Sequence, residues 1–104
     1  MTYRIEIGIF ASKELAKLDS SVRMIVKKKI DALADNPQKG KPLGVNDKLG
    51  NPIWELRLFS PNVRIYYTIH KCEVIIEEIV YEGTVRVHKI GDKRSQRRDI
   101  GGLT

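Results

Sequence analysis

Two neighbouring segments in the second half of the chain alternate between apolar and polar positions, and this pattern constrains the fold more than any other feature. In residues 53–59 and 63–70, every second side chain is apolar, and Ser60-Pro61-Asn62 separates the two segments. A period of two is typical of strands that bury one face, and a short link containing proline is typical of a turn. We therefore predict two adjacent antiparallel strands, with one apolar face and one face that carries the charged residues.

The first third of the chain carries one strand pattern followed by a helical pattern. Apolar residues at every second position predict a strand over residues 3–10. From Leu15 to Leu33 the apolar residues recur at steps near three and four, which is typical of amphipathic helices. The cluster Asp19-Ser20-Ser21 interrupts this stripe, so we predict a helical hairpin at about 12–18 and 21–35.

The remaining segments complete an α+β fold. Residues 36–52 hold three prolines and three glycines and are predicted to form a loop, while the almost continuously apolar residues 73–81 are predicted to form a central strand. A short last strand is expected at 84–90, followed by a basic tail from about residue 91. The chain, residues 1–104, is thus predicted to be a single domain. It would combine an N-terminal strand, a helical hairpin and an antiparallel meander, with the helices packed on one face of a curved sheet.

Composition and charge exclude several classes of protein. A chain of 104 residues has room for one core, and its 19 Lys and Arg against 13 Asp and Glu leave a net charge of +6, which favours a polyanionic partner such as nucleic acid. No apolar run approaches the ~18 residues of a membrane span, and the charged N-terminus does not resemble a secretory signal. The single cysteine, Cys72, and two histidines are too few for a disulfide or for most metal sites. We therefore expect a cytoplasmic protein with no membrane, metal or cofactor.

Two arginines lie on the charged face of the strand pair. Arg57 and Arg64 fall in neighbouring predicted strands, and adjacent antiparallel strands bring such side chains within reach of each other. Two guanidinium groups repel each other unless an anion lies between them. That anion is either Glu55, in a structural pair with Arg57 or Arg64, or a phosphate, whose oxygens match the planar fork of arginine. The sequence leaves both interpretations open.

Further candidates gather toward the C-terminus. A histidine exchanges protons near neutral pH, so His88 is the first candidate for acid–base chemistry and Glu55 the second; the alternative for His88 is an ordinary, partly buried residue. Lys93 and Arg94 are candidates for holding a phosphate, unless the segment is a frayed, solubilising tail. Candidate RNA-binding residues are Lys89, Arg97, Arg98 and Lys48.

Several short strings, in order along nearly the whole chain, resemble a known family. They are Tyr3-Arg4-Ile5-Glu6-Ile7, Leu15-Ala16-Lys17-Leu18-Asp19, Gly40-Lys41-Pro42-Leu43, Trp54-Glu55-Leu56-Arg57, Val63-Arg64-Ile65-Tyr66-Tyr67 and Lys93-Arg94-Ser95-Gln96. Their order and spacing are similar to those of the RelE/ParE superfamily of toxins from bacterial toxin–antitoxin pairs, and within it to the HigB-like and RelE-like branch.

This resemblance implies a RelE-like fold and a function. Toxins of this kind cleave messenger RNA, often at the ribosome, and are neutralised by a co-encoded antitoxin. On the matching positions, Arg64 resembles the strand arginine that holds the scissile phosphate, and Arg57 the arginine of the preceding strand. Lys93 and Arg94 resemble the basic residues near the C-terminus. We therefore expect a metal-independent endoribonuclease in which the ribose 2′-OH attacks the adjacent phosphorus. The alternatives are a ParE-like inhibitor of DNA gyrase without nuclease chemistry, and a non-catalytic RNA-binding module.

Overall fold

The computed structural model of the chain describes residues 2–92 and 96–104, with the backbone alone at 96 and 97. The elements along the chain are β1 (Tyr3–Ile7), α1 (Ile9–Ala16), α2 (Ser20–Ala32), a 3-10 turn (Pro37–Lys39), β2 (Lys41–Asn46), β3 (Pro52–Phe59), β4 (Asn62–His70), β5 (Val74–Ile76), β6 (Ile79–Tyr81), β7 (Gly83–Gly91) and α3 (Gln96–Leu103). Five strands form one sheet in the order β1-β7-β4-β3-β2. Only β1 runs parallel to its neighbour, β7, and the other neighbours are antiparallel. The predicted α+β class is therefore confirmed.

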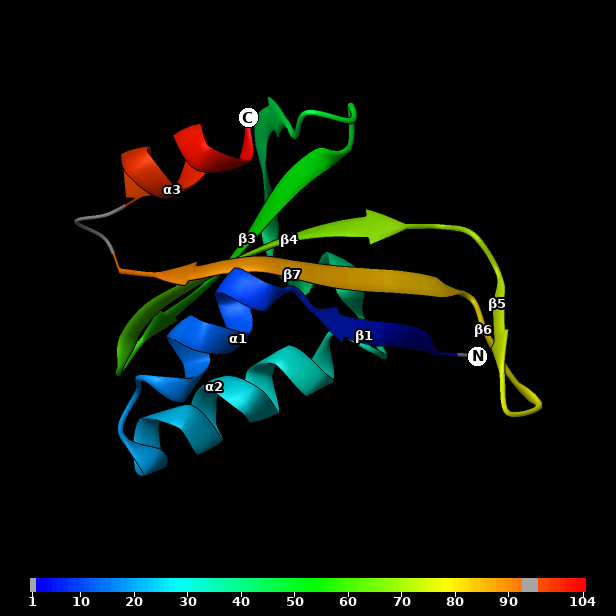
Figure 1. The fold of residues 1–104 in the computed structure, drawn as a ribbon, viewed down its shortest axis with the longest axis horizontal. Coiled ribbons are helices and arrows are strands. Elements are labelled where there is room, and N and C mark those ends of the chain that lie inside the picture. Colours follow the sequence, from blue (N-terminus) through cyan, green and yellow to red (C-terminus); the bar gives the residue numbers. More distant parts are fainter. Residues whose placement is uncertain (1, 93–95) are drawn as a thin grey trace.

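Helices cover both faces of this sheet rather than one. The predicted helical hairpin, α1 and α2, packs against one face, and α3 lies on the opposite side (Figure 1). The core lies between the sheet and α1–α2 and is formed by Tyr3, Ala11, Leu15, Val26, Ile30, Leu33, Leu56, Leu58, Val63, Ile65, Tyr67, Val85, Val87 and Ile90. None of the helices among the described residues has the length and apolar character of a membrane span.

The N-terminal strand is shorter than the sequence pattern predicts. β1 ends at Ile7, and Ile9 already lies in α1. The junction is Gly8, whose N–H donates to the carbonyl of Val87 at 2.8 Å and whose own carbonyl accepts from Ser12 at 2.9 Å. Gly8 therefore makes the last sheet contact and the first helical one, which ends the strand three residues before the predicted end.

The proline- and glycine-rich segment 36–52 is not only a loop. Residues 41–46 form β2, the outer strand of the sheet, with Lys41 opposite Glu55 and Pro42 opposite Trp54. An edge strand tolerates a proline because one side of its backbone needs no partner. The prediction of a loop was wrong here, and the correction brings Lys41 next to the charged face of β3.

The apolar run at 73–81 does not form a central strand. It folds into β5 and β6, a separate two-stranded hairpin that leaves several aliphatic side chains, such as Ile75 at 64% exposure, in contact with solvent. The turn consists of Glu77 and Glu78, both with positive φ angles of 50° and 69°. The strand that lies between β4 and β1 in the sheet is β7.

The predicted basic tail also contains an element. β7 continues to Gly91, and residues 96–103 form α3. Asp99 of this helix is 4% exposed, so α3 is packed against the rest of the molecule.

Candidate functional site

The predicted proximity of Arg57 and Arg64 is confirmed by the register of the sheet. β3 and β4 pair with Arg57 directly opposite Arg64 and Glu55 opposite Tyr66. Side chains alternate between the two faces of a strand, and the intervening residues, such as Leu56, belong to the core. The four polar side chains therefore share the face that points away from α1 and α2.

Arg64 forms a buried ion pair with Glu55. Its Nη1 donates to both carboxylate oxygens, at 3.2 Å to Oε1 and 3.1 Å to Oε2, and the two side chains are 6% and 0% exposed. Of the two interpretations that the sequence left open, the structural pair between Glu55 and Arg64 is the one observed. Nη1 of Arg64 is therefore occupied by a contact within the protein, and Arg64 holds the Glu55 carboxylate in place.

Arg57 has a different environment, although it lies directly opposite Arg64. It is half-buried, and its guanidinium carbon lies 4.6 Å from the centre of the Phe59 ring, which is a cation–π distance. Its Nε is buried and has no hydrogen-bond partner among the residues that the structure describes. Buried donors normally have a partner, so Arg57 retains capacity to bind an anion.

A cavity of about 290 Å³ opens beside Arg57. It is lined by Lys39, Gly40, Lys41, Glu55, Leu56, Arg57 and Phe59. Three cationic residues, one acidic residue and one aromatic residue therefore meet at this cavity. Lys39 and Lys41 were not among the sequence candidates, because the segment that carries them was predicted to be a loop with no fixed relation to β3.

Tyr67 fixes the segment that carries these two lysines. Its hydroxyl donates to the carbonyl of Pro37 at 2.7 Å and accepts from the N–H of Gly40 at 3.1 Å. Burial raises the pKa of Tyr67 to about 12, so the hydroxyl keeps its proton. A side chain at Gly40 would collide with the backbone oxygen of Glu55 and with this hydroxyl. Glycine is therefore required at this close approach, and the Lys39-Gly40-Lys41 string is positioned by it.

Tyr66 lies on the same face as Glu55, and the charge of Asp99 on α3 acts on its hydroxyl. It is fully buried, and burial, together with the nearby carboxylates of Glu55 and Asp99, raises the pKa of Tyr66 to about 12. Its hydroxyl has no hydrogen-bond partner in the described part of the chain. A phenol with this pKa can donate a hydrogen bond, but it does not act as a base at neutral pH.

His88 belongs to a second polar cluster farther along the sheet. Its Nε2 and that of His70 both contact the hydroxyl of Thr68, at 2.8 Å and 2.7 Å. Thr68 follows Arg64 by four residues on β4, which corresponds to about 13 Å along a strand. Burial, and then the charge of Arg86, lower the pKa of His88. The structure therefore does not bring His88 together with Arg57, and its imidazole is neutral at pH 7.

The other sequence candidates are dispersed. Lys89 forms an ion pair with Glu14 at 3.1 Å and lies 4.0 Å from Asp99. Lys48 is exposed in the turn between β2 and β3, and Arg98 is exposed on α3. Lys93 and Arg94 lie outside the described residues, and so does the side chain of Arg97.

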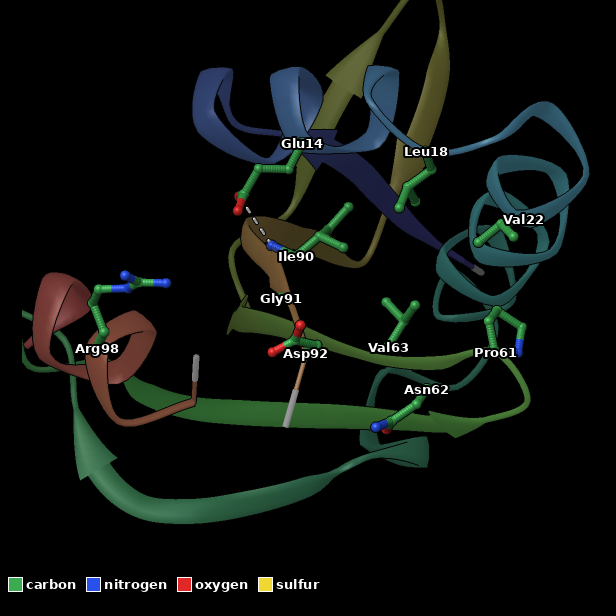
Figure 2. Close-up of a pocket in the computed structure, with 10 residues that line it drawn as sticks. All are labelled: Glu14, Leu18, Val22, Pro61, Asn62, Val63, Ile90, Gly91, Asp92 and Arg98. Atoms are coloured by element: carbon green, nitrogen blue, oxygen red, sulfur yellow. Dashed lines mark hydrogen bonds between the residues drawn. The ribbon is translucent and has the colours of Figure 1, made fainter. Parts of the chain in front are cut away.

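A larger cavity, of about 610 Å³, is lined by residues of α1, α2, the turn between β3 and β4, β4, β7 and α3. Figure 2 shows that its apolar wall comes from Leu18 in the link between α1 and α2, Val22 of α2 and Val63 of β4, while Arg98 approaches from α3. The Glu14 carboxylate at its edge accepts a hydrogen bond from the N–H of Ile90 at 3.2 Å. Of the predicted catalytic residues in the described part of the chain, none lines this cavity, and we do not place the site here.

Solved structures of bacterial toxins resemble this chain over most of its length. A chain of the intact E. coli RelBE toxin–antitoxin complex is 27% identical with a TM-score of 0.62, over 86% of this chain and 95% of that one. A mutant of E. coli RelE in the free state is 24% identical with a TM-score of 0.66, and each chain is covered completely. The isolated E. coli RelE toxin is 23% identical with a TM-score of 0.61, over 98% and 99% of the two chains. No protein-family model and no curated protein sequence matches.

These structural neighbours support the resemblance to RelE toxins that the short sequence strings predict. They share the arrangement of strands and helices described above, and they lie on the RelE side of the predicted superfamily. The HigB-like branch stays a prediction.

Proposed function

We propose that the chain belongs to the RelE toxin superfamily, whose fold its solved neighbours share, that it is the toxin of a toxin–antitoxin pair and that it cleaves messenger RNA at the ribosome. The partner that neutralises it would be a cognate antitoxin, as expected from the neighbouring RelBE complex. The reaction would be a metal-independent endonucleolytic cleavage.

One observation carries this proposal: the cavity that is lined by Arg57, Lys39 and Lys41 together with Glu55. Cations that converge on a small cavity are suited to a phosphate and to the charge that develops when it is attacked. The formal net charge of +6 attracts RNA to the surface as a whole. A cytoplasmic location, which the target implies, belongs to the same proposal.

The geometry suggests a role for each group. The Glu55 carboxylate would accept the proton of the ribose 2′-OH, and the freed oxygen would attack the adjacent phosphorus. Arg57 would stabilise the additional negative charge on the phosphorane oxygens. Arg64 would act as a positioning residue, because its contacts hold the carboxylate of Glu55 in one orientation. The P–O5′ bond would then break, which leaves a 2′,3′-cyclic phosphate and a 5′-OH.

The leaving O5′ atom needs a proton from a separate donor. His88 is poorly suited, because it lies far along the sheet from Arg57 and burial keeps it neutral. We therefore propose Lys93, the remaining sequence candidate with a transferable proton.

The decisive experiment is primer extension on an mRNA incubated with the protein, with and without ribosomes. We expect cuts that depend on Arg57, with Arg57→Ala reducing the rate by roughly 100-fold or more, the usual effect of removing one donor to a developing oxyanion. Arg23→Ala is the matched control, because Arg23 is exposed on α2 and its loss changes the net charge equally. Circular dichroism would establish that both variants are folded.

Two results would contradict the proposal. If Arg57→Ala cleaves as fast as the wild type, the cavity beside Arg57 is not the active site. If the protein cuts no RNA with or without ribosomes but inhibits DNA supercoiling by gyrase, the ParE-like alternative replaces the nuclease. RNA binding without either activity would favour the non-catalytic module.

A further inference from the structure

An exposed phenylalanine borders the cavity at the end of β3. Phe59 is the last residue of that strand and is 75% exposed. Single exposed apolar residues are common on protein surfaces, so its exposure alone carries no meaning. The environment of Phe59 sets it apart, because the Arg57 guanidinium lies over its ring and both side chains line the same cavity as Lys39 and Lys41.

These groups have the chemistry of a site for single-stranded nucleic acid. Aromatic rings and arginine planes are surfaces on which unpaired bases stack, and neighbouring lysines neutralise the phosphates of the same strand. The Arg57–Phe59 pair presents one charged plane and one apolar plane at the cavity wall. The volume of about 290 Å³ lies at the small end of ligand pockets, which suits one base rather than a longer stretch.

We propose that Phe59, backed by Arg57, is a stacking platform for one unpaired RNA base, with the flanking phosphates on Lys39 and Lys41. The inference rests on the proposed function for the class of its ligand. It adds a contact to the base, whereas the cleavage mechanism concerns the sugar and the phosphate. Every base has a π-face, so the platform holds the strand in position without selecting one sequence.

The backbone of the Lys39-Gly40-Lys41 string is held in a fixed position relative to β3, which carries Phe59. Tyr67 binds this segment through the carbonyl of Pro37 and the N–H of Gly40, and Lys41 lies opposite Glu55 in the sheet. Lys41 and the ring are therefore held on neighbouring strands, β2 and β3, and Lys39 lies in the 3-10 turn directly before β2. A base on Phe59 and a phosphate on the lysines would belong to the same short stretch of RNA.

The test measures binding without cleavage. The probes are two fluorescein-labelled hexanucleotides in which every ribose is 2′-O-methylated, which removes the nucleophile of the proposed reaction. One carries uracil at each position, and the other has abasic sugars with the same phosphates. Fluorescence anisotropy with the full chain gives the Kd for each.

Phe59→Ala should weaken binding of the uracil probe by roughly 5- to 100-fold, the range for loss of one base–aromatic stack, and leave the abasic probe unchanged. Phe59→Trp should restore binding of the uracil probe. Phe10→Ala is the matched control, because Phe10 is 67% exposed on α1 and lies outside this cavity, so it should change neither Kd.

Three outcomes overturn the platform: a wild-type protein that binds both probes equally, a Phe59→Ala variant that binds the uracil probe like the wild type, or a variant that loses both probes to the same extent. These results are separate from those that decide the proposed function. If the protein prefers the uracil probe through Phe59 but cuts no RNA, the stacking platform is supported and the proposed nuclease activity is refuted. If RNA cleavage depends on Arg57 but the Phe59→Ala variant binds the uracil probe normally, the nuclease activity is supported and the stacking platform is refuted.

Discussion

Replacing Arg64 by methionine should destabilise the protein strongly, because the change removes the buried guanidinium that contacts both oxygens of the Glu55 carboxylate. Both side chains are nearly or completely buried, and Nη1 contacts both carboxylate oxygens. Removing one partner of a buried ion pair destabilises a protein by roughly 3–5 kcal/mol. With an unfolding entropy of about 2.1 cal/mol/K per residue, a chain of 104 residues should lose about 4–5 °C of Tm per kcal/mol. The expected decrease is therefore about 14–23 °C.

The double variant Glu55→Leu/Arg64→Met tests the physical reason. Well-packed apolar residues of similar volume often replace a buried ion pair without loss of stability, since neither charge then has to be removed from water. We expect the double variant to regain most of the stability that Arg64→Met loses. It should still be inactive in RNA cleavage, because it lacks the proposed proton acceptor.

Urea unfolding followed by circular dichroism, at constant pH and salt, gives the free energy of unfolding for the wild type, the two single variants and the double variant. The coupling energy follows from the four values. The reasoning is refuted if Arg64→Met loses less than about 1 kcal/mol, as an exposed pair would. It is refuted equally if the double variant is as unstable as the sum of the single variants.

Three further predictions concern backbone packing, pH and salt. Gly40→Ala should lower the free energy of unfolding, because the new Cβ meets the hydroxyl of Tyr67 at 2.6 Å. Gly101→Ala meets no atom within 4 Å and should raise the free energy of unfolding by up to about 1 kcal/mol through helix propensity. Urea unfolding of the two variants tests both expectations. The pKa of His88 is lowered in the folded protein, so the unfolded chain binds more protons below pH ~6.5 and stability should fall as the pH drops through this value. His88→Gln should reduce that loss in thermal melts at pH 7.5 and 5.5, and an equal loss in both proteins would contradict the assignment. Log Kd for single-stranded RNA should change linearly with log salt, and Arg57→Ala should reduce the slope by about 0.7 if its guanidinium binds a phosphate; an unchanged slope in salt titrations would exclude that contact.

The strand pair that carries the candidate site was predictable from the sequence. Val63, Ile65 and Tyr67 enter the core, and Arg57 lies opposite Arg64, as the period of two and the short turn predict. Alternation does not decide which anion satisfies an arginine, because both Glu55 and an external phosphate fit the same spacing. Only the side-chain contacts resolve this choice, and they select Glu55 for Arg64.

The predictions of secondary structure were wrong where the local sequence pattern favours one element and the pairing with distant residues favours another. The alternation from Tyr3 continues through Ile9, but Gly8 already bonds to Val87 and starts α1. The run at 73–81 is apolar enough for a central strand, yet Glu77 and Glu78 adopt the positive φ angles of a hairpin turn. Glutamates carry no signal for such a turn, which glycine and asparagine normally mark.

The site residues that sequence reasoning missed depend on long-range pairing. Lys39 and Lys41 reach the cavity only because the segment before β2 is held by Tyr67, 27 residues from Gly40 along the chain. Phe59 is the last residue of β3, and the alternating pattern of this strand predicts the face on which Phe59 lies but not the residues that surround it. No local motif contains this information, although Gly40 between two lysines marks the place where the backbone comes close to β3.

The parallel pairing of β1 with β7 has a consequence for the order of synthesis. β1 comprises residues 3–7, but its hydrogen-bonding partner β7 spans residues 83–91 and is made by the ribosome well after β1. Contacts between such distant segments form late and slow the acquisition of the native state. A nascent or prematurely terminated chain that lacks β7 therefore lacks the strand to which β1 attaches, and the five-stranded sheet can form only after β7 has been translated.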